Sequence, residues 1–293
     1  MNGILQANRT AETFATAETY GRRVRAVVGL VRSVAREARI RIRPDGTLSC
    51  VVVDHANVGG VRFEWTPETF ETDRDEEYRT AWDVGVLEST LKFARKGRGK
   101  GAVGDPVTLT FEGYPGGDEA TKGRTVVGVE RDELARETRV PNVNPAATRD
   151  EPPDVDLSEY HAWEAAVDAG VLSEGFDALA RTAGHVDVET DGDGLVLSNG
   201  AEGREDTIRM SGSVAPTGDA GAGADANASS KLLLDYCTDF ADAMGAARVG
   251  DVTLRWGEKA PVSIRFANAE WGLSGEFFLA PRVNRDELDG DRP

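Results

Sequence analysis

The amino-acid sequence predicts an α+β protein made of two similar halves, each combining antiparallel strands with two helices. The clearest evidence is residues 231–283, which form one amphipathic helix pattern followed by three strand patterns. Two earlier stretches repeat an order of helices and strands, and a charged, proline-containing segment without periodicity lies between them. We therefore expect domains at residues 1–129 and 158–293, joined by a connector over residues 130–157.

The predicted C-terminal helix has an apolar face formed by residues at helical spacing: Leu233, Tyr236, Cys237, Phe240 and Met244. Asp235, Asp239 and Asp242 occupy its other face. The strands are expected at residues 251–256, 262–266 and 270–279, and the sequence LAPRV follows them. One helix across an antiparallel meander leaves sheet edges that require a partner.

The earlier elements follow from the same patterns. Residues 20–38 are predicted as a helix with Thr19 as its cap, and residues 84–94 as a second helix. In the second half, a helix ending at Thr182 is capped by Asp168 or Ser173. Strands are expected at residues 12–19, 39–43, 47–53, 61–65, 107–112, 125–129, 160–167, 185–190, 194–198 and 207–211, before a low-complexity loop over 212–230.

The order helix, three strands, LAPRV resembles the C-terminal end of the DNA polymerase sliding clamps, the proliferating cell nuclear antigen (PCNA) family. A second motif supports the likeness, because Val53-Asp54-His55-Ala56-Asn57-Val58-Gly59 resembles the VDxANVG motif of that family. Residues 152–157, PPDVDL, resemble the close of its interdomain connector. The resemblance covers nearly the whole chain.

The composition indicates a halophilic protein. The 293 residues carry a net charge of −17, and only six of the 34 basic residues are lysines. This acidity suggests a haloarchaeon or a haloarchaeal virus. No signal peptide or membrane span is expected, and Cys50 and Cys237 are expected as reduced core thiols, so we predict a cytoplasmic protein, in the host cytoplasm if viral.

Positive charge is concentrated in two segments of this acidic chain. Residues 22–43 carry +7 and residues 92–101 carry +5. Such segregation favours a nucleic-acid contact over a merely solvated helix face. The candidate DNA-binding residues are Arg22, Arg23, Arg25, Arg32, Lys92, Arg95, Lys96, Arg98 and Lys100.

No catalytic, cofactor or metal motif is recognised, so an enzyme is not expected. The three histidines are far apart in sequence, and no paired Cys/His spacing is present. The sequence GRGKG at residues 97–101 follows a helix and lacks the spacing of a phosphate-binding loop. The acidic turn at residues 191–194 lacks the further ligands of a calcium loop.

The resemblance implies a pseudo-sixfold ring of three subunits, with helices lining the hole and sheets outside. Such a homotrimer encircles duplex DNA without sequence specificity and tethers DNA polymerase, a clamp loader and other replication or repair proteins as a processivity factor. It also implies a pocket for partner peptides. The matching positions are Val53, Asp54, His55, Leu134, Ala280, Pro281 and Val283.

Two alternatives remain at this stage. The chain could be a monomeric clamp-like adaptor or decoy, or a DNA-binding protein that uses the arginine-rich helix of residues 22–39. The resemblance also has one departure, because the aspartates of the last helix replace the basic residues usual there. Either hydrated cations bridge these aspartates to DNA, or only the N-terminal half contacts phosphates.

Overall fold

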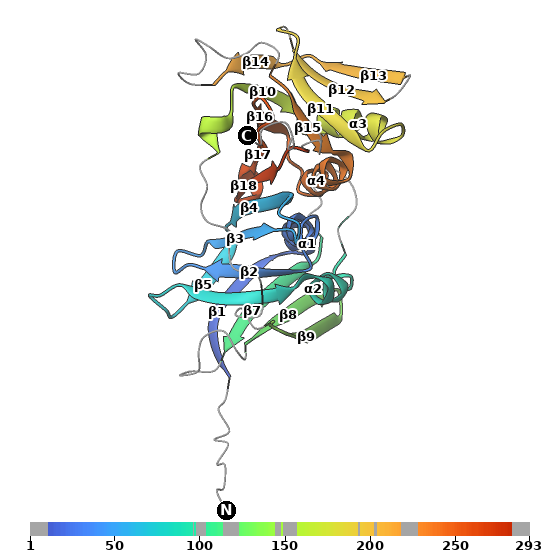
Figure 1. The fold of residues 1–293 in the computed structure, drawn as a ribbon. Coiled ribbons are helices and arrows are strands. Elements are labelled where there is room, and N and C mark those ends of the chain that lie inside the picture. The colour runs from blue at the N-terminus through green and yellow to red at the C-terminus, as the bar shows by residue number, and fades with distance from the viewer. Residues whose placement is uncertain are drawn as a thin grey trace, which may run out of the picture. The chain divides into compact units, whose positions relative to one another are not determined.

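The computed structural model describes residues 11–95, 97, 104–113, 123–143, 148, 157–192, 194–201, 204–217 and 228–282. Its elements follow one plan twice: a strand, a helix, five strands, a helix and three strands (Figure 1). The first pass runs from β1 (Glu12–Tyr20) to β9 (Leu134–Pro141), and the second from β10 (Trp163–Asp168) to β18 (Leu273–Leu279). This order confirms the predicted α+β class.

Two compact units divide the chain, and they are not contiguous in sequence. Unit 1 contains Met1–Val28, Arg36–Cys50 and Glu64–Glu151, and unit 2 contains Gly29–Ala35, Val51–Phe63 and Pro152–Pro293. Helix α1 (Gly21–Arg32) and strands β3 (Leu48–Val53) and β4 (Gly59–Trp65) therefore contribute residues to both units.

Unit 1 contains an antiparallel sheet with the strand order β5-β1-β7-β8-β9. Its further strands are β5 (Thr69–Thr72), β7 (Pro106–Gly113) and β8 (Arg124–Arg131). Strand β2 (Glu37–Ile42) pairs with β6 (Tyr78–Asp83) and with the start of β3. Helix α2 (Val84–Leu91) follows β6, and the Asp83 carboxylate caps it by accepting a hydrogen bond from the Val86 amide at 2.9 Å.

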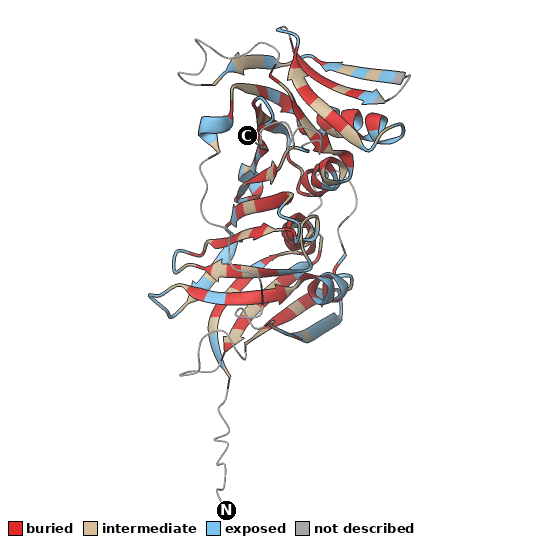
Figure 2. Cartoon of the chain, in the orientation of Figure 1, coloured by how far each residue is buried: buried red, intermediate tan, exposed pale blue. Residues whose placement is uncertain are grey.

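Unit 2 contains two sheets and two helices. In one sheet, which has nine strands in all, the strands β14-β10-β16-β17-β18-β4 are neighbours in this order, and the other sheet has the order β13-β12-β11-β15. The further strands are β11 (His185–Thr190), β12 (Leu195–Ala201), β13 (Arg204–Met210), β14 (Ser213–Pro216), β15 (Ser230–Leu233), β16 (Asp251–Trp256) and β17 (Val262–Asn268). Helices α3 (Ala169–Ala180) and α4 (Leu234–Ala246) contact each other, and their buried faces belong to the core (Figure 2). Short 3₁₀ helices occupy Ser158–Tyr160 and Ala269–Trp271.

The helix predicted over residues 20–38 is too long. It ends at Arg32, and the residues from Glu37 onward form β2 instead. Ala38, Ile40 and Ile42 alternate with more exposed residues, and this two-residue period matches the pairing of β2 with β6. The second helix is also shorter than predicted, ending at Leu91. Thr19 is not the cap of α1, because it is buried within β1.

Five strands were not expected from the sequence: β5, β6, β9, β14 and β15. Strand β9 lies inside the segment predicted as a connector, and β14 lies inside the predicted low-complexity loop. Val140 is the one buried side chain of β9. An edge strand with so little buried surface has no apolar alternation to reveal it. The strands β11 and β16, in contrast, have the predicted ends.

No described helix is both long and apolar enough to cross a membrane.

Candidate functional site

The segment between β3 and β4, which carries the VDHANVG motif, is organised around the carboxylate of Asp54. This carboxylate accepts hydrogen bonds from the backbone amides of Ala56 (3.2 Å), Val58 (2.7 Å) and Gly59 (3.1 Å). The phenol of Tyr236 in α4 donates a fourth hydrogen bond, at 2.6 Å. Asp54 therefore fixes the turn locally and attaches it to a helix far away in sequence.

The ionisation of this pair is set by burial and by these donors. Burial alone raises the pKa of Asp54, but the hydrogen bonds from Tyr236 and the backbone amides outweigh it and hold the pKa below its usual value. Burial and the neighbouring Asp54 raise the pKa of Tyr236 to about 12. At neutral pH the pair is therefore a carboxylate that accepts a hydrogen bond from a neutral phenol.

Two glycines allow this segment to lie close to its neighbours. A Cβ atom on Gly59 would come within 2.8 Å of the Tyr236 ring, and one on Gly60 would overlap the ring of Phe278 in β18. The amide of Ala280 also donates a hydrogen bond to the Val58 carbonyl oxygen at 2.7 Å. These contacts, all within unit 2, bring the VDHANVG motif together with the LAPRV motif.

The predicted peptide-binding positions are only partly assembled by these contacts. Val53 and Pro281 are half-buried, and His55 is exposed. Leu134 belongs to unit 1, where it is 60% exposed at the start of β9. Val283 lies outside the described residues.

Several predicted DNA-binding residues are engaged within the protein. The guanidinium of Arg25 donates to the carbonyl oxygens of Leu91 (2.9 Å) and Ala94 (2.6 Å) at the end of α2, and burial lowers its pKa. The Leu91 carbonyl oxygen also accepts a hydrogen bond from the Ala94 amide at 3.1 Å, and Arg25 adds a charged side-chain donor at this helix end, so it acts as a side-chain cap. Arg23 forms an ion pair with Glu68, which leaves its side chain 12% exposed.

The remaining predicted DNA-binding residues, in α1 and after α2, differ in their exposure and in their contacts within the protein. Arg95 forms ion pairs with Asp105 (2.9 Å) and Asp132 (3.3 Å). Lys92 and Arg32 are exposed, and Arg22 is half-buried. Lys96, Arg98 and Lys100 lie outside the described residues.

The acidic face of α4 is present as expected from its spacing. Asp235, Asp239 and Asp242 are all exposed. Burial, followed by the charges of Asp242 and Asp235, raises the pKa of Asp239, and the nearby charge of Arg32 opposes this shift. Among the described residues, no group of three or more His, Cys, Asp and Glu side chains could hold a metal ion.

Sequence reasoning missed two polar features. Tyr236 was placed on the apolar face of its helix, and its hydroxyl bond to Asp54 has no sequence signal because 182 positions separate them. A network around the buried Glu276 was also missed, although polar or charged residues at alternate positions of β16 (Asp251, Thr253, Arg255) and β17 (Ser263, Arg265) indicate one polar sheet face. Cys50 and Cys237 are buried and free, as expected, and burial raises the pKa of both thiols, that of Cys50 to about 12.

Comparison with curated proteins relates the whole chain to one group. The chain is 28% identical over 273 residues to a DNA polymerase sliding clamp of Natronomonas pharaonis, covering 92% of this chain and 98% of the relative. A DNA polymerase sliding clamp of Methanococcoides burtonii is 23% identical over 258 residues, covering 85% and 91%. No protein-family model matches the sequence.

Solved structures give the same answer for the fold. PCNA of A. fulgidus with the C-terminal region of FEN-1 bound matches with a TM-score of 0.71 and 22% identity, covering 92% of this chain and 99% of that one. PCNA of Thermococcus kodakaraensis matches with a TM-score of 0.72 and 15% identity, covering 92% and 100%. The chain therefore has the clamp fold of PCNA, and over nearly its whole length its sequence is similar to DNA polymerase sliding clamps.

Proposed function

We propose that this chain is a sliding clamp that encircles duplex DNA and tethers DNA polymerase and other replication and repair proteins, including a clamp loader. The observation that carries the proposal is the similarity to DNA polymerase sliding clamps over 92% of the chain, together with the PCNA fold. The clamp performs no chemistry of its own and uses no cofactor. It increases processivity by keeping the polymerase at its template.

The twice-used plan of elements supports a ring of three chains with pseudo-sixfold symmetry. Each pass supplies two helices and the same order of strands. We propose that the two halves are the two clamp domains. Because β9 completes the first pass of the repeated order of elements, the first domain would include β9, and the connector would begin after Pro141. The acidic composition and the Natronomonas pharaonis relative support a cytoplasmic protein of a halophilic archaeon or of its virus.

The edges of the sheets support self-assembly. Strand β9 is the last strand of its sheet in unit 1, and β13 is the last strand of its sheet in unit 2. Each is accompanied by a helix with an exposed valine: α2 contacts β9 and carries Val86 (42% exposed), and α3 contacts β13 and carries Val171 (48% exposed). Pairing β9 of one subunit with β13 of the next would continue both sheets and cover both valines.

The DNA contact we propose is weak and depends on ring closure. At molar salt the Debye length is about 3 Å, so phosphate contacts alone hold DNA poorly. A closed ring remains linked to DNA without strong contacts. Arg32 and Lys92 are exposed and are the first candidates to contact phosphates, with the half-buried Arg22 and with Lys96, Arg98 and Lys100 as further candidates.

Partner peptides would bind where the two sequence motifs meet in unit 2. The A. fulgidus PCNA structure contains the C-terminal region of FEN-1, which supports a peptide as the partner. The Ala280–Val58 hydrogen bond joins the two motifs that contain Val53, Asp54, His55 and Pro281.

The first experiment measures the molar mass of the protein by light scattering, in about 2 M KCl and in low salt. The mass tests the assembly, and its dependence on salt tests whether the protein is halophilic. Three times the chain mass of 31.4 kDa is expected in high salt. Val86→Asp should shift the protein toward the monomer, whereas Glu88→Gln on the same helix should not. A monomer under both conditions would overturn the homotrimer and favour the adaptor alternative.

Encirclement is tested with the same protein on nicked circular DNA and on the linearised form. After loading, the ring should remain on the circle and be lost from the free ends of the linear molecule. Equal retention on both would contradict a sliding ring and favour direct DNA binding.

A further inference from the structure

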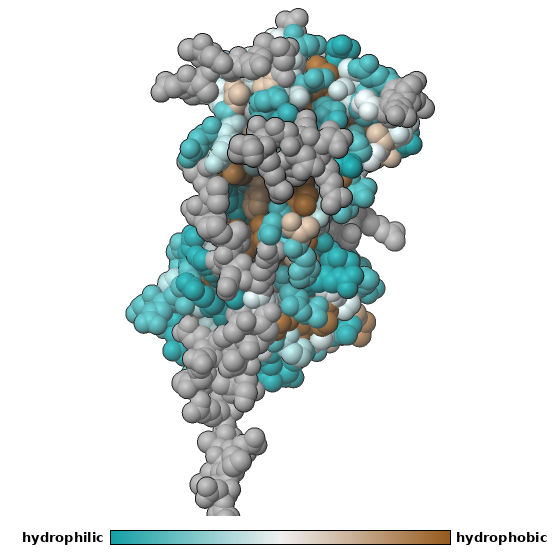
Figure 3. Space-filling view, in the orientation of Figure 1, coloured by the Kyte–Doolittle hydropathy of each residue, from teal (hydrophilic) through white to brown (hydrophobic). Residues whose placement is uncertain are grey.

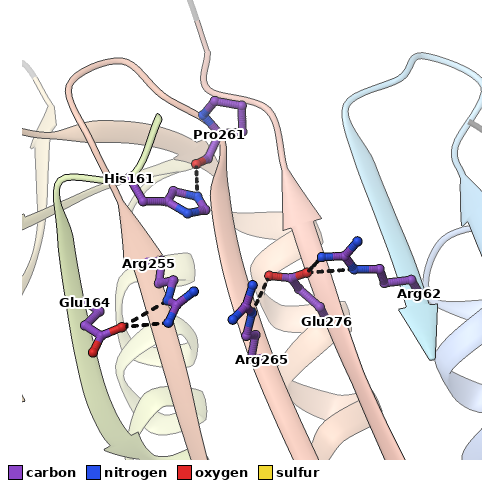
Figure 4. Close-up of polar contacts among 7 residues, drawn as sticks. All are labelled: Arg62, His161, Glu164, Arg255, Pro261, Arg265 and Glu276. Carbon is purple, nitrogen blue, oxygen red and sulfur yellow. Dashed lines mark hydrogen bonds and ion pairs between the residues drawn. The ribbon is translucent and has the colours of Figure 1, made fainter. Parts of the chain in front are cut away.

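A row of charged side chains crosses five adjacent strands of unit 2 (Figure 4). Its members come one from each strand and are Glu164 (β10), Arg255 (β16), Arg265 (β17), Glu276 (β18) and Arg62 (β4). Phe277, the next residue after Glu276, stacks on Phe240 of α4 with ring centroids 4.2 Å apart. Since successive residues of a strand point to opposite faces, the charged row lies on the face that α4 does not cover.

The row is centred on a buried carboxylate held by two arginines. Glu276 is 5% exposed and accepts hydrogen bonds from Nε of Arg62 (2.7 Å) and Nε of Arg265 (3.0 Å). Burial alone raises its pKa, but Arg265 and Arg62 outweigh this and hold the pKa below its usual value. Arg255 pairs with Glu164 at 2.9 Å. The residues drawn in Figure 4 therefore place three guanidinium groups beside two carboxylates.

His161 adds a buried nitrogen without a partner. The side chain is 4% exposed, its Nε2 lies 3.0 Å from the carbonyl oxygen of Pro261, and its Nδ1 has no hydrogen-bond partner in the described part of the chain. Because the Pro261 oxygen can only accept, Nε2 carries the proton and Nδ1 is bare in the neutral ring. Figure 4 shows that Nδ1 faces the side of Arg255. Buried polar atoms of this kind normally have a partner.

The row adjoins the segment where partner peptides are proposed to bind. Arg255 lies opposite Ser263 in the sheet, and Ser263 lies opposite Phe278. Arg255 and Phe278 are therefore two strands apart on one face, about 10 Å. The Phe278 ring contacts Gly60 at the end of the VDHANVG segment. In this region Figure 3 shows a small apolar area over β17 and β18 within a largely hydrophilic surface.

We propose that His161, Arg255 and Arg265 bind the carboxylate of an acidic residue in the partner peptide, next to its apolar contact at Phe278. This inference rests on the proposed function, because it assumes a docked peptide. When His161 is protonated, Nε2–H keeps its bond to Pro261 and Nδ1–H donates to the incoming carboxylate. Charge complementarity favours an acidic residue over a basic one at this position.

The site predicts a pH dependence with a definite sign. In the free protein, burial is the main cause that lowers the pKa of His161; Arg255 and Arg265 lower it further, and Pro261 and Glu276 oppose them. A bound carboxylate stabilises the imidazolium and raises this pKa. By linkage, an acidic peptide then binds more tightly as the pH falls, and each unit of pKa rise corresponds to tenfold in affinity.

The experiment uses fluorescently labelled peptides with the sequence of the FEN-1 C-terminal region that is bound to A. fulgidus PCNA. Two glutamates are added at either end in turn, and matched peptides carry glutamines. We expect one glutamate peptide to bind about five- to tenfold more tightly than its glutamine match near pH 6, with a smaller ratio near pH 7.5. His161→Gln should abolish the change of the ratio with pH. The double variant Glu164→Gln/Arg255→Gln should reduce the ratio itself, and Arg181→Gln, at the exposed end of α3, should leave both unchanged.

A second readout is the pKa of His161 followed by NMR with and without the peptide. It should rise on addition of the glutamate peptide and stay unchanged with the glutamine peptide. Equal binding of both peptides, or a constant pKa, would overturn the acidic site while leaving peptide docking intact. If no peptide binds, the acidic site and the peptide docking of the proposed function both fail, whereas ring formation is judged separately by molar mass.

Discussion

Helix α1 carries four arginines, and helix α4 carries three aspartates and no basic residue. In α1, Arg25 caps the end of α2 and Arg23 pairs with Glu68. In α4, all three aspartates are exposed. The comparison shows that two helices with similar numbers of charged residues differ in how many of those charges are available to a partner. The positive charge of α1 partly stabilises the fold, and the negative charge of α4 lies at the surface.

The largest expected effect is on stability and comes from removing the Arg25 side chain of α1. Arg25→Ala removes a charged donor from two helix-end carbonyls and should lower the free energy of unfolding by about 2–3 kcal/mol. Urea denaturation in high KCl measures this. Arg32→Gln, on the exposed last turn, is the matched control and should change the stability by less than about 0.5 kcal/mol. Similar losses in both variants would show that the two arginines play equivalent roles.

A smaller effect is expected from the buried side of α4. Tyr236→Phe removes the hydroxyl donor to Asp54 and should lower the free energy of unfolding by about 1–2 kcal/mol. The pKa of Asp54 is lowered in the folded protein, so its stabilisation is present above the unfolded pKa and is lost as the pH falls through the folded value. Without the Tyr236 donor the folded pKa of Asp54 lies closer to its unfolded value, so less stability is lost on acidification and this loss is complete at a higher pH.

The control for this variant is Tyr160→Phe, since Tyr160 is 54% exposed. Unfolding free energies measured between neutral and acid pH distinguish the two. If the free energy of unfolding of Tyr236→Phe falls with acid pH as that of the unmodified protein does, the phenol does not stabilise the Asp54 carboxylate.

The smallest expected effect on stability comes from reversing the charge of the exposed face of α4, a change that acts mainly on the DNA contact. Asp235→Lys combined with Asp242→Lys reverses the exposed face of α4 and should tighten the DNA contact of the proposed ring. Each new phosphate contact should steepen the slope of log affinity against log salt by about 0.9. Retention on nicked circular DNA over a salt series measures this. Asp251→Lys with Glu71→Lys makes the same change of charge at exposed positions outside the helices; equal slopes in both double variants would exclude a particular role for α4.

Much of the fold could be predicted because its pattern is local. The alternation in β11 and β16 and the helical spacing in α4 are complete within a few residues. Residues 33–38 were misassigned to a helix because Val34 and Ala35 continue the apolar spacing of α1, whereas the pairing of β2 with β6 depends on residues forty positions away. Strand β9 was missed because its side chains are mostly exposed.

The candidate site shows the same limit more strongly. The motif containing Asp54 was recognised from sequence, but its attachment to Tyr236 depends on a contact between distant segments. Arg25 was expected to contact DNA because it lies in a segment of concentrated positive charge. Its actual partners, the carbonyl oxygens of Leu91 and Ala94, could not be predicted because no sequence pattern identifies a backbone acceptor. His161 and Glu276 likewise became informative only when the sheet placed Arg255 and Arg265 beside them.

The two sheet edges have a consequence for the life of a single subunit. A newly made chain, or one released from a ring, presents the backbone groups of both β9 and β13 to any strand it meets. The charged residues Arg136, Glu137 and Arg139 of β9 disfavour pairing with apolar strands, which reduces aggregation. If the ring forms as proposed, its assembly then protects each subunit, and the cellular concentration of the chain sets how much of it survives in a usable form.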